Sequence, residues 1–234
     1  MSTLIRLFVP DALAPGAVIA TNAGQAHYLG NVMRRSAGEA LLLFNGRDGE
    51  WRARIGGISR KEAILHVDSL ERPQAAEPDM ILAFAPLKRD ATELVVEKAT
   101  ELGVSAIMPV LTARGQTARL NLDRLGLIAA EAAEQSERLS VPEIRPPIPL
   151  EALLRGWPME RRLAVAAERR EAPPLAPPMG GLLIGPEGGF TERELDGLAQ
   201  CPFVSLTSLG DRILRAETAA IAGLARLLAS PLTV

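Results

Sequence analysis

The sequence predicts an α/β protein in which a small, mainly β domain precedes a larger domain built on a parallel sheet. Three observations carry this prediction. Short β-rich runs separated by glycine turns fill residues 1–72, and a polar stretch with two prolines follows at 71–78. Beyond it, apolar runs alternate with amphipathic helical patterns. We therefore expect one domain over residues 1–72 and a second over residues 76–234.

Strand-forming residues in the first domain gather in four runs, Leu4–Val9, Ala40–Phe44, Trp51–Ile55 and Ala63–Val67. Asn-Gly at 45–46 and Asp-Gly at 48–49 supply residues that adopt positive φ, so the chain turns back between the second and third runs. One helix interrupts the strands, because apolar residues recur at helical spacing from Ala26 to Met33. These features predict a small barrel or sandwich.

Apolar runs in the second domain predict five buried strands at Met80–Ala85, Ala106–Val110, Leu163–Ala167, Leu182–Ile184 and Phe203–Thr207. The first helix between them is predicted to start at a capping pair, Asp90 with Glu93, and to stop at Gly103. A second helix is expected from Asp123 to Leu139. The last helix carries an apolar stripe that predicts a buried or dimer-forming face, made of Leu214, Ile221, Leu224, Ala225 and Leu228.

Composition excludes several classes of protein. A single cysteine, Cys201, excludes an internal disulfide, and with two histidines it is too little for a Cys/His zinc cluster, so we expect no metal. No apolar run is long enough to span a membrane, and the first residues lack a secretion signal, which predicts a cytoplasmic protein. The formal net charge of −2 means that nucleic acid would have to be bound by a local basic patch.

The segment most informative about chemistry is a buried strand that enters a glycine-rich turn and then a helix, residues 182–194. Its three glycines let backbone groups approach a ligand, while Thr191 and Glu194 have the spacing of a capping box that fixes the turn. An ordinary strand-to-helix turn would need only one glycine, so we favour a ligand site. The pattern is neither the dinucleotide-binding fingerprint nor a phosphate loop, which argues against both of those ligands.

A second segment, residues 206–219, repeats the order of strand, glycine turn and helix. Arg212, Arg215 and Glu217 gather where the helix begins. A cation at a helix N-terminus is mildly unfavourable, so Arg215 there indicates a nearby anion, nucleobase carbonyl or buried carboxylate. An exposed salt bridge with Glu217 or Asp211 explains the same residues equally well.

Together these two segments resemble the RsmE family of SPOUT methyltransferases, which methylate N3 of a uridine in bacterial 16S ribosomal RNA. The resemblance extends over nearly the whole chain, and its landmarks include residues 6–10, His27 with 32–34, 97–104, the helix end at 131–138, 141–144, 185–189 and 212–218. It implies an N-terminal PUA-like RNA-binding β-barrel and a C-terminal domain whose last segments form a trefoil knot around S-adenosylmethionine. It also implies a homodimer with active sites at the interface.

The resemblance assigns the cofactor to three loops, which comprise Glu168, Ile184, Gly185, Pro186, Glu187, Gly188, Gly189, Leu209, Gly210, Ile213, Leu214 and Arg215. Uridine N3 is protonated at neutral pH, so we expect Arg215 to stabilise the developing uridine anion and Glu217 to act as the base or as the partner of Arg215. Candidate RNA phosphate contacts are Arg34, Arg35, Arg114 and Arg138. Two alternatives remain: a SPOUT methyltransferase acting on another RNA, and a non-catalytic RNA-binding factor in ribosome assembly.

Overall fold

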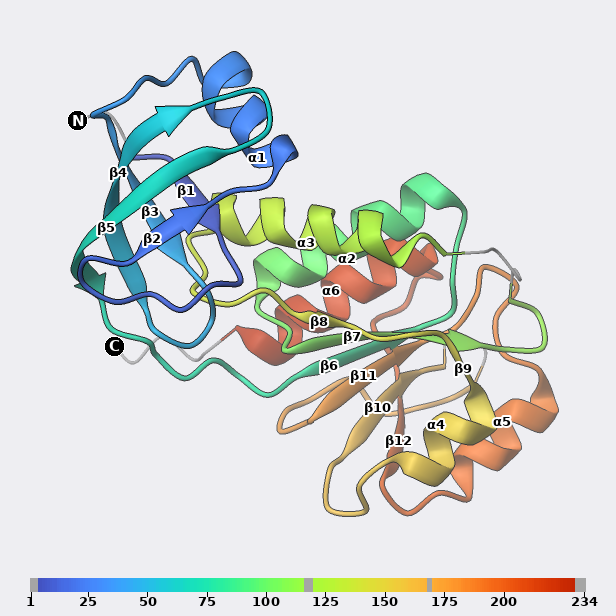
Figure 1. Ribbon diagram of the computed structural model, residues 1–234. Helices are drawn as coiled ribbons and strands as arrows, with labels where there is room; N and C mark the ends of the chain where they lie inside the picture. Colours follow the sequence, from blue (N-terminus) through green and yellow to red (C-terminus); the bar gives the residue numbers. More distant parts are fainter. Residues whose placement is uncertain (1–3, 116–119, 168–169, 230–234) are drawn as a thin grey trace. The chain divides into compact units, whose positions relative to one another are not determined.

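A computed structural model describes residues 4–115, 120–167 and 170–229 (Figure 1). The chain divides into two compact units. The first comprises Met1–Ala76 together with Ala133–Val141, and the second comprises Glu77–Ala132 together with Pro142–Val234. The inclusion of residues 133–141 in the first unit was not foreseen from the sequence.

The first unit is built on a five-stranded sheet in the order β1-β3-β4-β5-β2. Its strands are β1 (Arg6–Phe8), β2 (Val18–Ala20), β3 (Ala40–Phe44), β4 (Glu50–Ile58) and β5 (Ala63–Arg72). All pairs are antiparallel except β1 with β3. Gly46 and Gly49 both have positive φ in the β3–β4 turn, as the Asn-Gly and Asp-Gly pairs predicted. Strand β2 was missed because three residues between polar segments give no periodic signal.

The predicted helix of this unit is interrupted. It consists of α1 (Ala23–His27) followed directly by a π-helical turn, η1 (Tyr28–Val32). Asn22 and Gln25 form a capping box at its start. Ala26 and Leu29 are buried as expected, whereas Val32 and Met33 are exposed, because the wider π turn rotates them away from the core.

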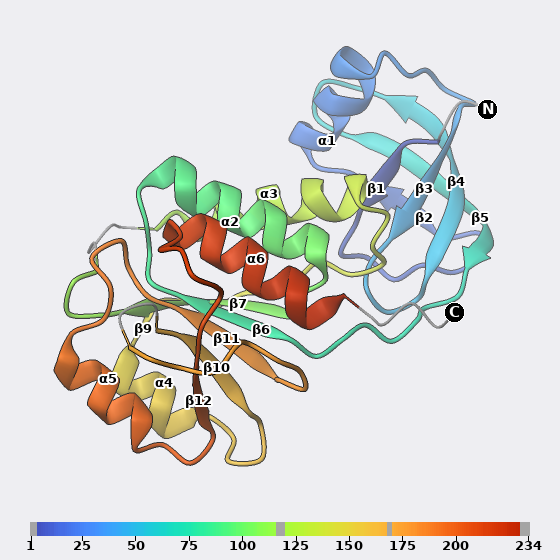
Figure 2. The same ribbon diagram turned by 180° about the vertical axis from the view of Figure 1, so that it is seen from behind.

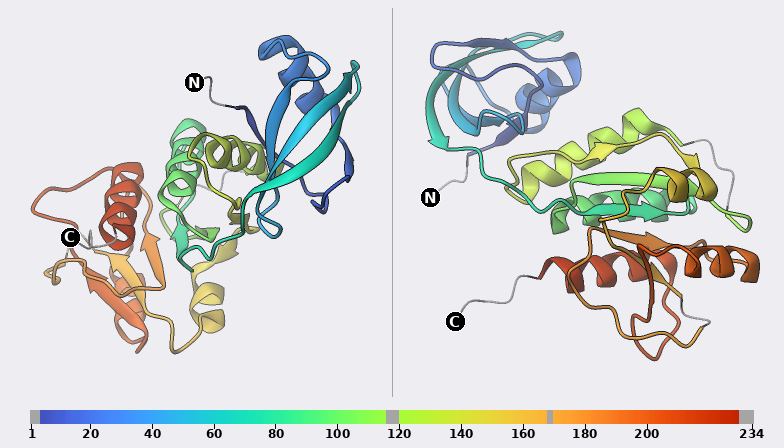
Figure 3. Two further views of the ribbon diagram at one scale, coloured as in Figure 1. Left: turned by 90° about the vertical axis from the view of Figure 1, so that its left-hand side faces the viewer. Right: turned by 90° about the horizontal axis from the view of Figure 1, so that it is seen from below.

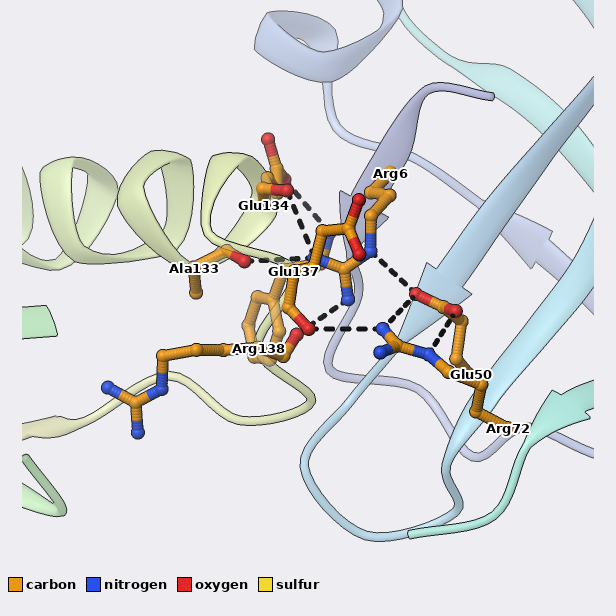
Figure 4. Close-up of polar contacts among 8 residues, drawn as sticks. Arg6, Glu50, Arg72, Ala133, Glu134, Glu137 and Arg138 are labelled. Carbon is orange, nitrogen blue, oxygen red and sulfur yellow. Dashed lines mark hydrogen bonds and ion pairs between the residues drawn. The ribbon is translucent and has the colours of Figure 1, made fainter. Parts of the chain in front are cut away.

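Residues 133–141 are held in the first unit by a buried arginine (Figure 4). The Arg6 guanidinium is 7% exposed and donates to the carbonyls of Ala133 (2.9 Å), Glu134 (3.0 Å) and Arg138 (2.6 Å). It also donates to Glu50 Oε1 at 2.6 Å. The last carbonyls of a helix lack partners within the helix, so Arg6 satisfies groups that would otherwise be buried without hydrogen bonds.

Glu50 joins a second arginine to this cluster (Figure 4), accepting from Arg72 at 2.7 and 3.0 Å. Burial alone would raise the pKa of Glu50, but hydrogen bonds from Arg72 and Arg6 outweigh burial and hold that pKa below its ordinary value. The carboxylate is therefore charged and fully paired.

The second unit is built on a seven-stranded, all-parallel sheet in the order β12-β10-β11-β6-β7-β8, with β9 paired to the far end of β7. The strands are β6 (Ile81–Phe84), β7 (Ala106–Leu111), β8 (Glu143–Ile144), β9 (Ile148–Pro149), β10 (Leu163–Ala166), β11 (Gly181–Ile184) and β12 (Val204–Thr207). The five predicted strands are thus confirmed, while the two-residue strands β8 and β9 were not predicted.

Helices cover both faces of this sheet (Figures 2 and 3), as an all-parallel sheet requires. They are α2 (Arg89–Leu102), α3 (Leu122–Gln135), α4 (Leu150–Gly156), α5 (Glu192–Ala199) and α6 (Ala216–Leu228). Among the described residues, no helix is long and apolar enough to cross a membrane.

Two expectations about these helices are corrected. The capping pair of α2 does not form, because Lys88 is its N-cap without a side-chain hydrogen bond, whereas Gly103 ends the helix at φ 101° as predicted. Helix α3 stops at Gln135, four residues earlier than expected. On α6, Leu224 is fully buried, and a Cβ at Gly223 would lie 2.7 Å from Leu182 Cδ2. This part of the apolar stripe is therefore covered by the chain's own sheet.

Candidate active site

A cavity of about 360 Å³ opens where the carboxyl ends of β10 and β11 meet the start of α6. Strands β11 and β12 flank β10 on opposite sides, so the loops that follow β10 and β11 run in opposite directions along the sheet. A divergence of this kind in a parallel sheet is where ligands ordinarily bind. The volume of the cavity falls within the range of small-molecule sites, roughly 300–1,000 Å³.

The glycine-rich turn forms one wall of this cavity, and each glycine has its own role. A Cβ at Gly185 would lie 2.9 Å from the ring of Phe190, which itself lines the cavity. Gly189 has φ 70° and donates to the Pro186 carbonyl at 2.7 Å. Gly188 lies on the outer side, because a Cβ there would contact the Arg114 side chain at 3.6 Å. Gly185 thus makes room for Phe190.

The predicted capping box holds the turn in place. Thr191 donates to Glu194 Oε2 from its backbone N–H (2.7 Å) and its hydroxyl (2.9 Å), and its Oγ1 accepts from the Glu194 N–H at 3.2 Å. The other carboxylate oxygen of Glu194 accepts from the Ala113 N–H at 2.8 Å. Arg114 also donates to the Gly188 carbonyl at 3.2 Å. Two contacts therefore fasten the loop after β7 to the glycine-rich turn.

We expect Glu194→Gln to weaken S-adenosylmethionine binding about fivefold, since the amide keeps one acceptor and loses about 1 kcal/mol of hydrogen bonding to Thr191 or Ala113. Thr191→Ala is the matched control, because it removes a helix cap yet leaves the Ala113 contact. Calorimetric titration with S-adenosylmethionine measures both. Equal losses in the two variants would mean that Glu194 serves only as a helix cap.

Arg215 and Glu217 both line the cavity, at the start of α6. Arg215 is the exposed N-cap residue, and Glu217 is half-buried in the first turn. In the described part of the chain, Arg215 forms no ion pair with Glu217 or Asp211, so the exposed salt bridge considered from the sequence is not formed. Both side chains remain available to a ligand.

Most residues predicted to bind the cofactor lie around this one cavity, namely Ile184, Gly185, Pro186, Glu187, Gly189, Ile213, Leu214 and Arg215. Gly188, Leu209 and Gly210 do not line it. Leu209 instead packs against α6, where Arg226 donates to its carbonyl at 3.4 Å, and Gly210 is exposed at φ 138°. Glu168 lies outside the described residues.

The lining residue Ala167 ends the predicted strand directly before Glu168, where the first predicted loop begins. Five other lining residues were not predicted: Ala166, Phe190, Leu195, Ala216 and Ala219. They are small or apolar and belong to a strand end or to helix starts, where sequence patterns indicate core packing rather than a site. The available signal was their position directly beside the two glycine turns.

The four arginines predicted to contact RNA phosphates have different surroundings. Arg34 is exposed, with φ 52°, and Arg35 pairs with Glu39 at 2.9 Å. Arg114 holds the glycine-rich turn, as described above. Arg138 is 8% exposed and donates to Ser140 Oγ at 3.1 Å, and such burial argues against a phosphate contact. Among residues 4–115, 120–167 and 170–229, no group of His, Cys, Asp or Glu side chains forms a metal site.

Comparison with known proteins identifies the family. Residues 75–228 match the model of an RNA methyltransferase domain, and residues 21–68 match that of an RNA methyltransferase PUA domain. The chain is 34% identical to ribosomal RNA small subunit methyltransferase E of Rickettsia conorii, over 94% of this chain and 93% of that protein. The chain belongs to the ribosomal RNA small subunit methyltransferase E family.

Solved structures of similar proteins agree with this family and with the predicted fold class. The methyltransferase E of Neisseria gonorrhoeae, solved bound to S-adenosyl methionine, is 29% identical, with a TM-score of 0.86 over 95% of each chain. A protein from Legionella pneumophila, solved with the bound cofactor SAM, is 32% identical, with a TM-score of 0.85 over 97% of each chain. The PUA-like β unit and the SPOUT-type parallel sheet are therefore confirmed.

Proposed function

We propose that this protein transfers a methyl group from S-adenosylmethionine to N3 of one uridine in the 16S ribosomal RNA of the small ribosomal subunit. The observation that carries the proposal is the cavity in which the glycine-rich turn faces Arg215 and Glu217. Relatives with this family's name support the substrate, and the Neisseria and Legionella structures support the cofactor. We expect the protein to act in the cytoplasm, because its proposed substrate is ribosomal RNA.

The residues of the cavity fit this cofactor. S-Adenosylmethionine combines an apolar-faced adenine with a sulfonium cation and an amino acid end. Ile184, Phe190 and Leu195 provide apolar surface, while Glu187 and Glu217 provide carboxylates. When bound, the cofactor supplies the electrophilic methyl group, so the protein has mainly to align the acceptor and manage its proton.

Arg215 and Glu217 act on the N3 proton of uridine and on the negative charge that remains when it leaves. In this proposal Glu217 accepts the N3 proton of uridine. The nitrogen lone pair would then form the new bond to the methyl carbon as the bond from that carbon to sulfur breaks, and the sulfur would leave with the electron pair as S-adenosylhomocysteine. The Arg215 guanidinium faces the oxygens of the base, where negative charge develops as the proton leaves. An interaction of Arg215 that grows stronger toward the transition state accelerates methyl transfer. An interaction equally strong in the substrate and in the transition state would not.

The two alternative functions predict different products in cells. Mass spectrometry of 16S ribosomal RNA from a strain lacking this protein should show one uridine without its N3-methyl group, restored by the wild-type gene. A methyl group lost from another RNA would instead favour the second substrate class. Unchanged methylation of all RNA would favour a non-catalytic assembly factor.

We also propose a division of labour in which residues 1–72 bind RNA and residues 76–234 hold the cofactor in a knotted site. Contacts that support the knot surround the segment after β12: the Ser208 N–H donates to the Pro173 carbonyl at 2.8 Å, and the Leu175 N–H donates to the Ser208 carbonyl at 2.9 Å. Arg226 of α6 donates to the carbonyls of Leu175 and Leu209.

We expect a homodimer. Ile213 is 76% exposed at the cavity wall, and Ile221 and Leu228 of α6 are only half-buried, so apolar surface is left beside the site. Sedimentation at micromolar concentration should give about twice the 25.0 kDa chain mass. A fully active monomer would contradict this expectation.

A further inference from the structure

A second cavity lies along the same carboxyl edge of the sheet as the candidate active site. Its volume is about 290 Å³, and it is lined by Leu87, Arg89, Thr92, Glu93, Leu120, Asn121, Arg124 and Leu125. These residues follow β6 and β7, and β6 is the direct neighbour of β11, whose end forms the active-site cavity. A long substrate lying across this edge would meet both cavities.

Two arginines in this cavity are held in place by one carboxylate. Glu93 accepts from Arg124 at 2.6 and 2.7 Å and from Arg89 at 2.9 Å. Hydrogen bonds from Arg124 and then from Arg89 lower the pKa of Glu93 to about 2, so it is charged at neutral pH. Among the residues that line the cavity, two cations against one anion leave a net charge of +1, while the carboxylates of Asp90 and Glu131 lie near enough to act on Arg124.

Within the described residues, both arginines retain donors for a ligand. Each guanidinium has five N–H groups, and only Nε of Arg89 and Nε and Nη2 of Arg124 donate to the carboxylate. The side chains are 72% and 47% exposed. Both lie in the first turn of a helix, where a cation is disfavoured, and each of these turns also carries an aspartate, Asp90 or Asp123.

The rest of the cavity is preformed and largely apolar. Leu87 and Leu125 are buried and line the cavity. The Leu87 N–H donates to the Thr92 hydroxyl, and that hydroxyl donates to the Leu87 carbonyl, both at 3.1 Å, which fixes the Leu87 backbone. The Asn121 side chain accepts from the Arg124 N–H at 3.1 Å. Apolar walls of this extent suit a nucleobase better than a bare anion.

We propose that this cavity, the Arg89–Arg124 cavity, binds a second nucleotide of the substrate RNA, near the target uridine. The phosphate contacts Arg89 and Arg124, and the base lies against the leucines. The proposal rests on the proposed function, since it requires an RNA substrate. A network that merely joins α2 to α3 would need neither the free donors nor the cavity.

The test is binding of 16S ribosomal RNA, transcribed in vitro, at several salt concentrations. Loss of two phosphate contacts in Arg89→Gln/Arg124→Gln should reduce the slope of log affinity against log salt by about 1.4 and weaken binding about tenfold at physiological salt. The glutamines can still donate to Glu93. The matched control is Arg145→Gln/Arg155→Gln, which removes the same charge near the start of β7 and the end of α4.

The proposal is supported if Arg89→Gln/Arg124→Gln shows the loss of RNA affinity and of salt slope, while the control variant keeps both within error of wild type. Arg89→Lys/Arg124→Lys should retain most of the salt slope. S-Adenosylmethionine affinity, measured by calorimetry, should be unchanged in every variant, which shows that the fold is intact. Equal behaviour of the two glutamine variants would overturn the proposal and leave the proposed function standing. A wild-type protein that neither binds nor methylates this RNA would overturn both.

Discussion

Arg215→Ala should lower the single-turnover rate of methyl transfer by about two to three orders of magnitude, which is the usual effect of removing one group that stabilises transition-state charge. Arg215 lines the cavity, is exposed, and has no carboxylate partner in the described part of the chain, so its removal disturbs no buried ion pair. RNA affinity should change little, since one contact among several is a small part of the total.

The matched control is Arg212→Ala. Arg212 is exposed on the same loop and does not line the cavity, so its loss removes an equal charge without touching the substrate. Its turnover should stay within a few-fold of wild type. Near-normal turnover in Arg215→Ala would remove this residue from the catalytic assignment, and equal losses in both variants would indicate a general effect of charge.

Arg6→Ala should reduce the free energy of unfolding by about 3–5 kcal/mol, the range observed when one partner of a buried ion pair is removed. The substitution leaves Glu50 buried beside the vacated space and deprives the carbonyls of Ala133 and Arg138 of their donor. Arg52→Ala is the control, because its partner Glu71 is exposed and exposed ion pairs contribute little to stability. Urea unfolding measures both, and equal losses would contradict a special role for Arg6.

The same variant should change how stability depends on pH. A carboxyl whose pKa is lowered on folding contributes stability above its unfolded pKa, about 4.3 for glutamate, and that contribution disappears as the pH falls through the folded pKa. Without Arg6, one of the two arginines that lower the pKa of Glu50 is absent, so acid unfolding should begin at higher pH. A fragment of residues 1–76 would lack the carbonyls of Ala133, Glu134 and Arg138, to which Arg6 donates.

Local patterns predicted the parts of the fold that depend on local physics. The five apolar runs became buried strands, as continuous apolar runs predict, and Thr191 and Glu194 formed their capping box because a cap depends only on near neighbours in sequence. The cavity was found through its two glycine turns.

Long-range contacts account for what the sequence did not predict. Arg6 reaches carbonyls 127 to 132 residues away, and no spacing rule connects them. Glu93 had the spacing of a cap, but the N-cap residue is Lys88, and Glu93 instead accepts from Arg124, 31 residues further on. Arg114, a candidate phosphate contact, also donates to the Gly188 carbonyl, 74 residues further on, and no local pattern predicts that contact.

The most direct measurement uses the purified protein, S-adenosylmethionine labelled in its methyl group, and 16S ribosomal RNA or small subunits from a strain lacking the gene. After digestion to nucleosides, we expect the label in N3-methyluridine from a single position, with little transfer by Arg215→Ala. Label on another atom or base, or no transfer to either substrate, would contradict the assignment of this site to uridine N3 methylation.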